Sequence, residues 1–92
     1  MQINFSKRFE REFLEIYMYI SEDSFSSADN FKSELINSMQ ILKDFPYMYR
    51  KSKKTNNKNI RDMIYKKYVI PYKVTENEIL ILGIFNQNIW KI

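Results

Sequence analysis

The stretch IRDMIYKKYVIPYKVTENEILIL, Ile60–Leu82, decides the fold. Within it, apolar and polar positions alternate, and the apolar set is Tyr68, Ile70, Tyr72 and Val74. This period of two is typical of a strand with one buried face. Thr75–Glu78 has turn composition, and the unbroken apolar run Ile79–Leu82 predicts a strand covered on both faces. Because strand character already begins at Ile60, the stretch predicts three strands in a meander.

Pro71 constrains how these strands pair. Proline has no backbone N–H, so it cannot donate to a ladder of hydrogen bonds. We therefore expect Pro71 to lie at an edge of the sheet or at a bulge.

The preceding residues predict a short strand and two helices. An alternation at Ile3–Phe5 indicates a first strand, and Ser6 is a candidate N-cap. Apolar residues at helical spacing follow in two groups: Phe9, Phe13, Ile16, Tyr17 and Ile20, then Ala28, Phe31, Leu35, Met39 and Leu42. The Ser- and Asp-rich stretch Ser21–Ser27 supplies the turn between the helices. Asp44–Pro46 ends the second helix, because the residue before a proline disfavours the α region.

These elements predict a single α+β domain. We expect a strand at 1–6, an antiparallel helical hairpin at 7–45, a basic loop at 46–59, and strands with a C-terminal tail at 60–92. The hairpin would lie across one face of an antiparallel sheet that includes the three-stranded meander. A chain of 92 residues with 45% hydrophobic and 16% aromatic residues can form one small, dense core.

The composition excludes several kinds of site. The chain has no Cys and no His, so a disulfide, a thiolate metal site, a Cys nucleophile and the commonest zinc ligand are absent. We therefore expect no metal and no cofactor. No apolar run is long enough to span a bilayer, and Met1–Phe9 has no signal-peptide core. These features predict a cytoplasmic protein without a membrane partner.

Positive charge is concentrated in the second half of the chain. The net charge is +4, but nine cations against the single acid Asp62 lie between Arg50 and Lys73. Such a segment attracts phosphates or an acidic protein. The alternative is compositional drift, because Lys, Ile and Asn are abundant as in AT-rich coding. Drift explains Lys in place of Arg better than it explains the crowding of cations in one half.

Four segments resemble a known family: FEREFLEIYMYISED at Phe9–Asp23, LKDFPYMYR at Leu42–Arg50, NIRDMIYKKYVIPYKV at Asn59–Val74 and EILILGIF at Glu78–Phe85. In this order and spacing they look like the RelE/ParE superfamily of bacterial toxins, over nearly the whole chain. The resemblance implies a small basic toxin held inactive by a co-expressed antitoxin. It is closer to the ParE branch, because Arg61, Lys67 and Lys73 stand where that branch usually carries Arg.

The superfamily implies two mechanisms. ParE-like members inhibit DNA gyrase, and RelE-like members cleave mRNA at the ribosome. This chain has Val69 where RelE-like members usually place an Arg, and Gly83–Asn88 offers no strong acid or base for RNA cleavage. We therefore expect a gyrase inhibitor, with an mRNA endonuclease as the alternative. A toxin fold that binds its partner and poisons nothing is a third possibility.

The candidate site residues follow from charge and resemblance. Weak catalytic candidates are Arg61, Tyr65, Lys66 and Lys67. Candidates for binding the target or a nucleic acid are Arg50, Lys51, Lys53, Lys54, Lys58, Arg61 and Lys67, although the loop lysines could instead be a solvated surface. Candidates for binding the antitoxin are Phe85, Ile89 and Trp90, which could instead complete the protein's own core. The expected partners are a cognate antitoxin, in a hetero-oligomer, and gyrase or the ribosome with its mRNA.

Overall fold

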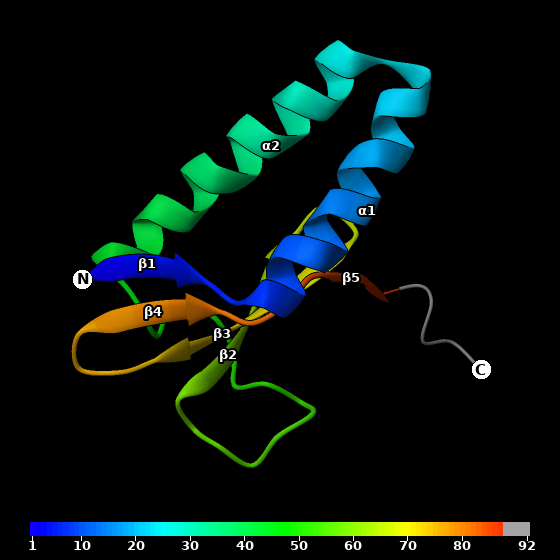
Figure 1. Ribbon diagram of the computed structural model, residues 1–92. Coiled ribbons are helices and arrows are strands. Elements are labelled where there is room, and N and C mark those ends of the chain that lie inside the picture. Colours follow the sequence, from blue (N-terminus) through cyan, green and yellow to red (C-terminus); the bar gives the residue numbers. More distant parts are fainter. Residues whose placement is uncertain (88–92) are drawn as a thin grey trace.

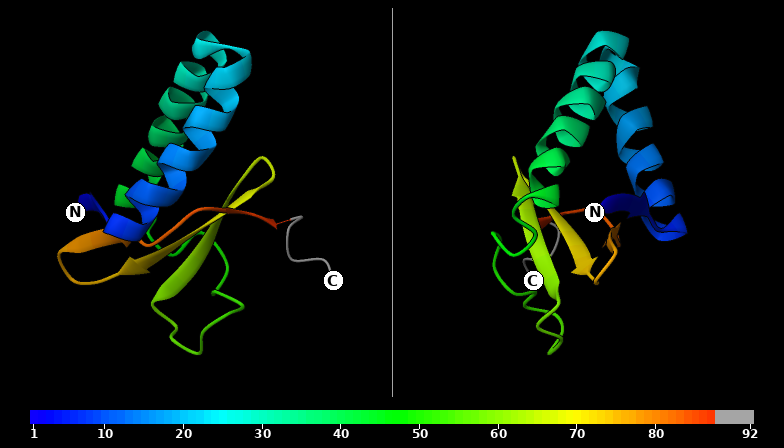
Figure 2. Two further views of the ribbon diagram at one scale, coloured as in Figure 1. Left: turned by 45° about the vertical axis from the view of Figure 1, so that its right-hand side comes forward. Right: turned by 90° about the vertical axis from the view of Figure 1, so that its left-hand side faces the viewer.

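The computed structural model describes residues 1–87 of the chain (Figure 1). The elements in chain order are β1 (Gln2–Phe5), α1 (Lys7–Asp23), α2 (Phe25–Gln40), the short 3-10 helix η1 (Ile41–Lys43), β2 (Ile60–Tyr65), β3 (Tyr68–Val74), β4 (Glu78–Ile81) and β5 (Phe85–Asn86). This order confirms the predicted strand, helical hairpin and meander. The helices form an antiparallel pair that packs on one face of the sheet and extends beyond it (Figure 2).

The sheet has mixed strand directions. Its strands lie in the order β1-β4-β3-β2, and β5 also pairs with β3. The meander β2-β3-β4 is antiparallel as predicted. The expectation of a wholly antiparallel sheet is wrong, because β1 pairs with β4 in parallel. The helices and the basic loop carry the chain from β1 to the opposite edge of the sheet, where β2 lies. The meander then returns across the sheet, so β4 ends beside β1 and runs in the same direction.

Two serines define the ends of the helices. The Ser6 hydroxyl accepts a hydrogen bond from the Phe9 N–H at 3.0 Å and donates to the Leu82 carbonyl at 2.8 Å. Ser24 ends α1 and caps α2, since its hydroxyl accepts from the Ser27 N–H. The predicted turn Ser21–Ser27 was therefore too long. One serine suffices because it satisfies backbone groups of both helices at once.

The core lies between the hairpin and one face of the sheet. Its fully buried members include Leu35, Met39, Leu42, Met63, Ile70, Tyr72, Ile79 and Ile81. Tyr68 and Val74 are also buried, which confirms the predicted inward face of β3. The run Ile79–Leu82 is not a strand covered on both faces, because Leu80 and Leu82 are only half-buried. We call the face of the sheet that packs against the helices the helix-facing side, and the opposite face the loop-facing side.

Pro71 lies in a central strand, opposite a bulge. Tyr72 pairs with Ile81, but Val69 pairs with Phe85, so one extra residue lies between β4 and β5. Asp62, the partner of Pro71 on β2, directs its own N–H away from β3 to the Arg50 carbonyl. The nitrogen of Pro71 therefore points toward the interruption between β4 and β5, where a ladder donor is not required.

Candidate functional site

The beginning of the basic loop is docked on the edge of β2. Lys51 forms a bridge with Arg61, the Ser52 N–H donates to the Ile60 carbonyl at 2.8 Å, and the Asp62 N–H donates to the Arg50 carbonyl at 3.0 Å. These bonds cover part of an edge that would otherwise expose backbone donors and acceptors. The first residues of the loop therefore have a defined position beside β2.

The buried carboxylate of Asp62 lies under this docked segment. Asp62 is 5% exposed, and its Oδ2 accepts from the Lys53 N–H at 3.4 Å and lies 3.8 Å from the Arg50 Nε. Ser52 is also buried, and its hydroxyl accepts from the Lys54 N–H. The one acid within the basic segment thus orients the loop that carries the cations.

Four predicted binding residues, Lys51, Lys53, Lys54 and Lys58, are exposed on this loop. Lys54 places its Nζ 4.1 Å from the centre of the Phe85 ring. This distance is within the range of a cation–π contact. The loop therefore passes over the loop-facing side of the sheet and joins a predicted target-binding residue to a predicted antitoxin-binding residue.

The Arg61 side chain, on β2, forms hydrogen bonds with the backbone of two other segments. Its Nε donates to the Lys58 carbonyl at 3.2 Å, and its Nη1 donates to the Tyr49 carbonyl at 3.1 Å. The guanidinium also lies 4.8 Å from the centre of the Tyr47 ring. Only a planar, multi-donor cation makes these contacts together. The geometry gives Arg61 a clear structural role at the base of the loop.

The other catalytic candidates lie at the opposite end of β2. Arg61 and Lys66 are five residues apart, about 16 Å along an extended strand. The hydroxyl of Tyr65 is buried and has no hydrogen-bond partner among residues 1–87. Lys66 has a left-handed backbone (φ 54°) in the turn before β3, and its Nζ lies 3.9 Å from the Glu34 carboxylate. The four candidates therefore do not converge on one point.

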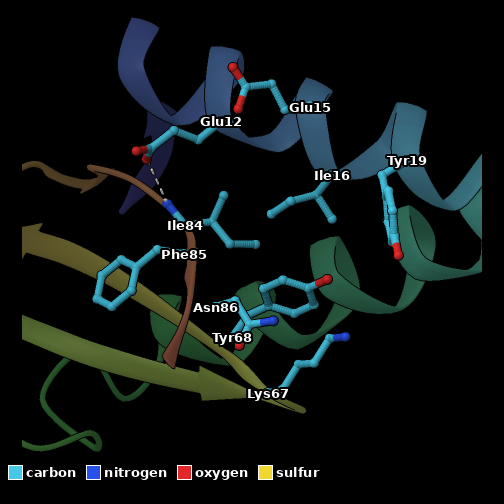
Figure 3. A pocket seen from close by; sticks show the side chains of 9 residues that line it. All are labelled: Glu12, Glu15, Ile16, Tyr19, Lys67, Tyr68, Ile84, Phe85 and Asn86. Carbon is cyan, nitrogen blue, oxygen red and sulfur yellow. Dashed lines mark hydrogen bonds between the residues drawn. The ribbon is translucent and has the colours of Figure 1, made fainter. Parts of the chain in front are cut away.

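Lys67 and Phe85 both line an open groove between α1 and the strands β3 and β5, although Figure 3 shows the two side chains apart from each other. The groove has a volume of about 430 Å³ and is lined by Glu12, Glu15, Ile16, Tyr19, Lys67, Tyr68, Ile84, Phe85 and Asn86. Acidic side chains from α1 form one wall, and Lys67 lies on the other. Burial raises the pKa of the Tyr68 hydroxyl, so this group stays protonated at neutral pH. The groove can therefore bind a polar segment but shows no paired acid and base.

Glu12 and Gly83 were not among the candidate residues expected from the sequence. Glu12 Oε1 accepts a hydrogen bond from the Ile84 N–H at 3.1 Å, which Figure 3 shows as a dashed line. Its Oε2 lies 3.2 Å from the Arg8 Nε. A Cβ on Gly83 would lie 2.6 Å from Glu12 Oε1. The one signal in the sequence is that Gly83 is the only glycine of the chain and interrupts an apolar strand.

A second groove, which is mainly apolar, runs along the outer surface of the hairpin. It is lined by Phe5, Phe9, Glu10, Phe13, Leu14, Tyr17, Lys32 and Ile36. The rings of Phe5, Phe9 and Phe13 stack in succession, with centroids 5.3 and 5.7 Å apart. Phe13 and Tyr17 of the predicted apolar stripe are only half-buried here, and Leu14, which lies outside that stripe, is 54% exposed. This groove is therefore a second apolar surface open to a partner.

The described residues contain no cluster of three or more His, Cys, Asp or Glu side chains that could hold a metal ion. Within residues 1–87, no helix combines the length and the hydropathy needed to cross a membrane.

The sequence matches a family model, ParE toxin of type II toxin-antitoxin system, parDE, over residues 3–89. No curated protein matches the chain. The chain shares its fold with solved structures, among them the following two. A chromosomal ParDE TA system from P. aeruginosa aligns with a TM-score of 0.74 and 16% identity, over 94% of this chain and 95% of that chain. A conserved hypothetical protein from Helicobacter pylori aligns with a TM-score of 0.61 and 19% identity, over 96% of each chain.

The two structural neighbours establish the fold, and the family model covers nearly the whole sequence. Together they confirm the resemblance to the RelE/ParE superfamily and its ParE branch. The chain belongs to the ParE toxin family of type II toxin–antitoxin systems.

Proposed function

We propose that this toxin inhibits DNA gyrase by binding it, and that a cognate antitoxin neutralises the toxin. The observation that supports the proposal is that the four candidate catalytic residues for RNA cleavage do not lie around one point. Arg61 is engaged with backbone carbonyls, the Tyr65 hydroxyl is buried, and Lys66 and Lys67 lie at the far end of β2. RNA cleavage needs a base, an acid and a cation around one phosphate. An inhibitor that binds a protein needs none of these.

Purified toxin, freed from its antitoxin and refolded, tests the proposal in a DNA supercoiling reaction with purified gyrase. We expect inhibition that rises with toxin concentration and disappears when antitoxin is added first. The matched control is a topoisomerase I relaxation reaction, which should be unaffected. Full supercoiling at a large molar excess of correctly folded toxin would reject gyrase as the target.

The alternative is a ribosome-dependent mRNA endonuclease, which the exposed loop cations Lys51, Lys53, Lys54 and Lys58 favour. A pulse-label after induction of the toxin separates the two functions. A gyrase inhibitor stops DNA synthesis first, whereas an endonuclease stops protein synthesis first. If protein synthesis stops first, the double change Lys66→Ala and Lys67→Ala should abolish arrest while antitoxin binding persists.

The proposed antitoxin contact includes Phe85, which is half-buried between the groove of Figure 3 and the basic loop. Ile89 and Trp90, the other two candidates, lie outside the described residues. Half-buried aromatic rings beside a groove are frequent anchors in protein interfaces. We expect Phe85→Ala to weaken antitoxin binding at least about tenfold in calorimetry, the factor for about 1.4 kcal/mol. Phe45→Ala is the control, since Phe45 is 60% exposed and outside both grooves.

A further inference from the structure

The pairing of β5 is offset by one residue from the pairing of β4. Tyr72 of β3 pairs with Ile81 of β4. If this register continued along the chain without a bulge, Ile84 would lie opposite Val69. The structure instead places Phe85 opposite Val69. Since successive side chains of a strand point to opposite faces, this offset of one residue decides which face Phe85 occupies.

The offset puts Phe85 on the loop-facing side and Ile84 on the helix-facing side. Phe85 shares its face with Val69 and carries the Lys54 ammonium on its ring. Ile84 is 2% exposed and belongs to the core cluster. Figure 3 shows the two side chains leaving the strand in different directions, with Ile84 toward Ile16 of α1. Without the offset, the two side chains would exchange faces.

Glu12 lies where the offset arises. The Gln87 N–H donates to the Lys67 carbonyl, so Phe85 and Gln87 direct their backbone groups toward β3. The alternate residue Ile84 directs its N–H away from β3, toward α1, and Glu12 Oε1 accepts it at 3.1 Å. The carboxylate thus takes the place of a neighbouring strand for this donor. Arg8 holds the second carboxylate oxygen at 3.2 Å.

Gly83 makes this approach of the carboxylate possible. Any side chain at position 83 would put its Cβ 2.6 Å from Glu12 Oε1, well inside van der Waals contact. Glu12 therefore fits against the backbone at Gly83, although the two residues are more than 70 positions apart in the sequence. This match explains why the single glycine of the chain lies in the bulge rather than in a turn.

We propose that Glu12 is a positioning residue that sets the register of β5 and thereby displays Phe85 on the loop-facing side. Its carboxylate holds the Ile84 N–H, the bulge forms around Gly83, and the strand re-enters the sheet one residue late. The consequence for partner binding rests on the proposed role of Phe85 in the antitoxin contact. The consequence for the strand register does not depend on that role.

NMR of the full-length protein tests the register directly. In the wild type we expect nuclear Overhauser contacts between the Phe85 ring and the Lys54 side chain, and slow exchange of the Ile84 and Gln87 amides. In Glu12→Ala we expect those contacts to disappear and both amides to exchange about tenfold faster or more, as for loss of a hydrogen bond to a charged group. Amides of β2, and those of β3 that face β2, should keep their protection.

Glu12→Gln is the conservative control. Glutamine keeps an oxygen that can accept from Ile84 but loses the ion pair with Arg8. We expect it to retain the Phe85–Lys54 contacts. Wild-type contacts and wild-type Gln87 exchange in Glu12→Ala would overturn the proposal, because the register would then be set without the carboxylate.

Gly83→Ala provides a second test that leaves Glu12 in place. The added methyl group must displace the carboxylate, so it should produce the same loss of contacts as Glu12→Ala. In the Glu12→Ala background, Gly83→Ala should add little, since the clashing atom is gone. Additive effects of the two changes would contradict a shared contact. This comparison also applies if either single variant is too unstable for a full assignment.

Antitoxin titration of the same variants separates the two proposals. Glu12→Ala can lose the wild-type register of β5 and also bind antitoxin about tenfold more weakly or worse. This result supports both the positioning role of Glu12 and the antitoxin contact of Phe85. If the register is lost and antitoxin affinity is unchanged, Glu12 still positions β5, and the proposed antitoxin role of Phe85 fails. If the register is intact in Glu12→Ala, the positioning proposal fails, whatever Phe85→Ala does to antitoxin binding.

Discussion

The two faces of the sheet are held by different kinds of contact. On the helix-facing side, fully buried side chains such as Ile70, Tyr72 and Leu35 form one continuous core. On the loop-facing side, the basic loop is held by single hydrogen bonds, an ion pair at Asp62 and one ring contact at Phe85. Apolar burial sums over many atoms, whereas each contact of the loop depends on one group. One side therefore stabilises the fold, and the other displays its charges.

Truncation in the core should have the largest effect. Leu35 is 0% exposed, so Leu35→Ala should lower the free energy of unfolding by about 2–5 kcal/mol, from lost burial and the cavity left behind. Leu14→Ala is the matched control, because Leu14 is 54% exposed on the neighbouring helix. It should change stability by less than about 0.5 kcal/mol. Urea denaturation followed by circular dichroism measures both, and equal losses would contradict the assignment of the core.

The buried hydroxyl of Tyr72 should make stability depend on alkaline pH. It donates to the Pro46 carbonyl at 2.6 Å, and burial raises its pKa to about 12. Because the folded pKa lies above the unfolded pKa of about 10, this contribution is complete below pH 10 and is lost as pH rises through 12. The loss approaches about 2.7 kcal/mol, or two pKa units.

Comparison with Tyr72→Phe isolates this effect from the other tyrosines. Below pH 10 the variant should be about 1 kcal/mol less stable than the wild type, for one lost hydrogen bond. The difference should shrink and then change sign as pH rises from 10 to 12, because the wild type alone loses stability when this hydroxyl ionises and the variant has no hydroxyl there. Tyr65→Phe is the matched control: its hydroxyl is buried without a partner among residues 1–87, so its removal should cost nothing. A constant difference up to pH 12 would show that Tyr72 ionises normally.

Removal of Arg61 tests whether the base of the loop is held by this side chain. Arg61→Ala breaks two hydrogen bonds to backbone carbonyls and the contact with the Tyr47 ring. We expect a loss of about 1.5–3 kcal/mol in the free energy of unfolding, the range for hydrogen bonds to a charged group. Arg61→Lys should recover less than half of it, because lysine lacks the planar fork. Full recovery by lysine would show that charge alone matters.

Neutralising the exposed loop cations should have the smallest effect on stability. Lys51→Gln and Lys53→Gln should each change the free energy of unfolding by less than about 0.5 kcal/mol. If the toxin acts on gyrase as proposed, each single change should also leave growth arrest intact. Loss of arrest with unchanged stability would instead make the loop a target-binding surface, and its dependence on salt would then distinguish phosphate from protein contacts.

The regular elements could be predicted because they depend on local patterns. Ser6 caps α1 as its position suggested, and the alternation over Tyr68–Val74 gave the inward face of β3. The expected site was only partly predictable. The sequence named the loop lysines and Phe85 as candidates, and these stay predictions. It did not name Glu12, because the Ile84 donor that Glu12 binds lies 72 residues away. An acid at helical spacing is ordinarily a solvated side chain, and nothing local distinguishes this one.

What the sequence by itself determined is therefore the order and type of the elements, the asymmetry of charge and the family. These follow from periods of 2 and 3.6 residues, from capping chemistry and from composition, all of which are properties of neighbouring residues. The tertiary structure alone decided the parallel pairing of β1 with β4, the docking of the loop by Arg61 and Asp62, and the face on which Phe85 lies. Each of these depends on contacts between residues far apart in the sequence, and for the strands a one-residue difference in register would change the result.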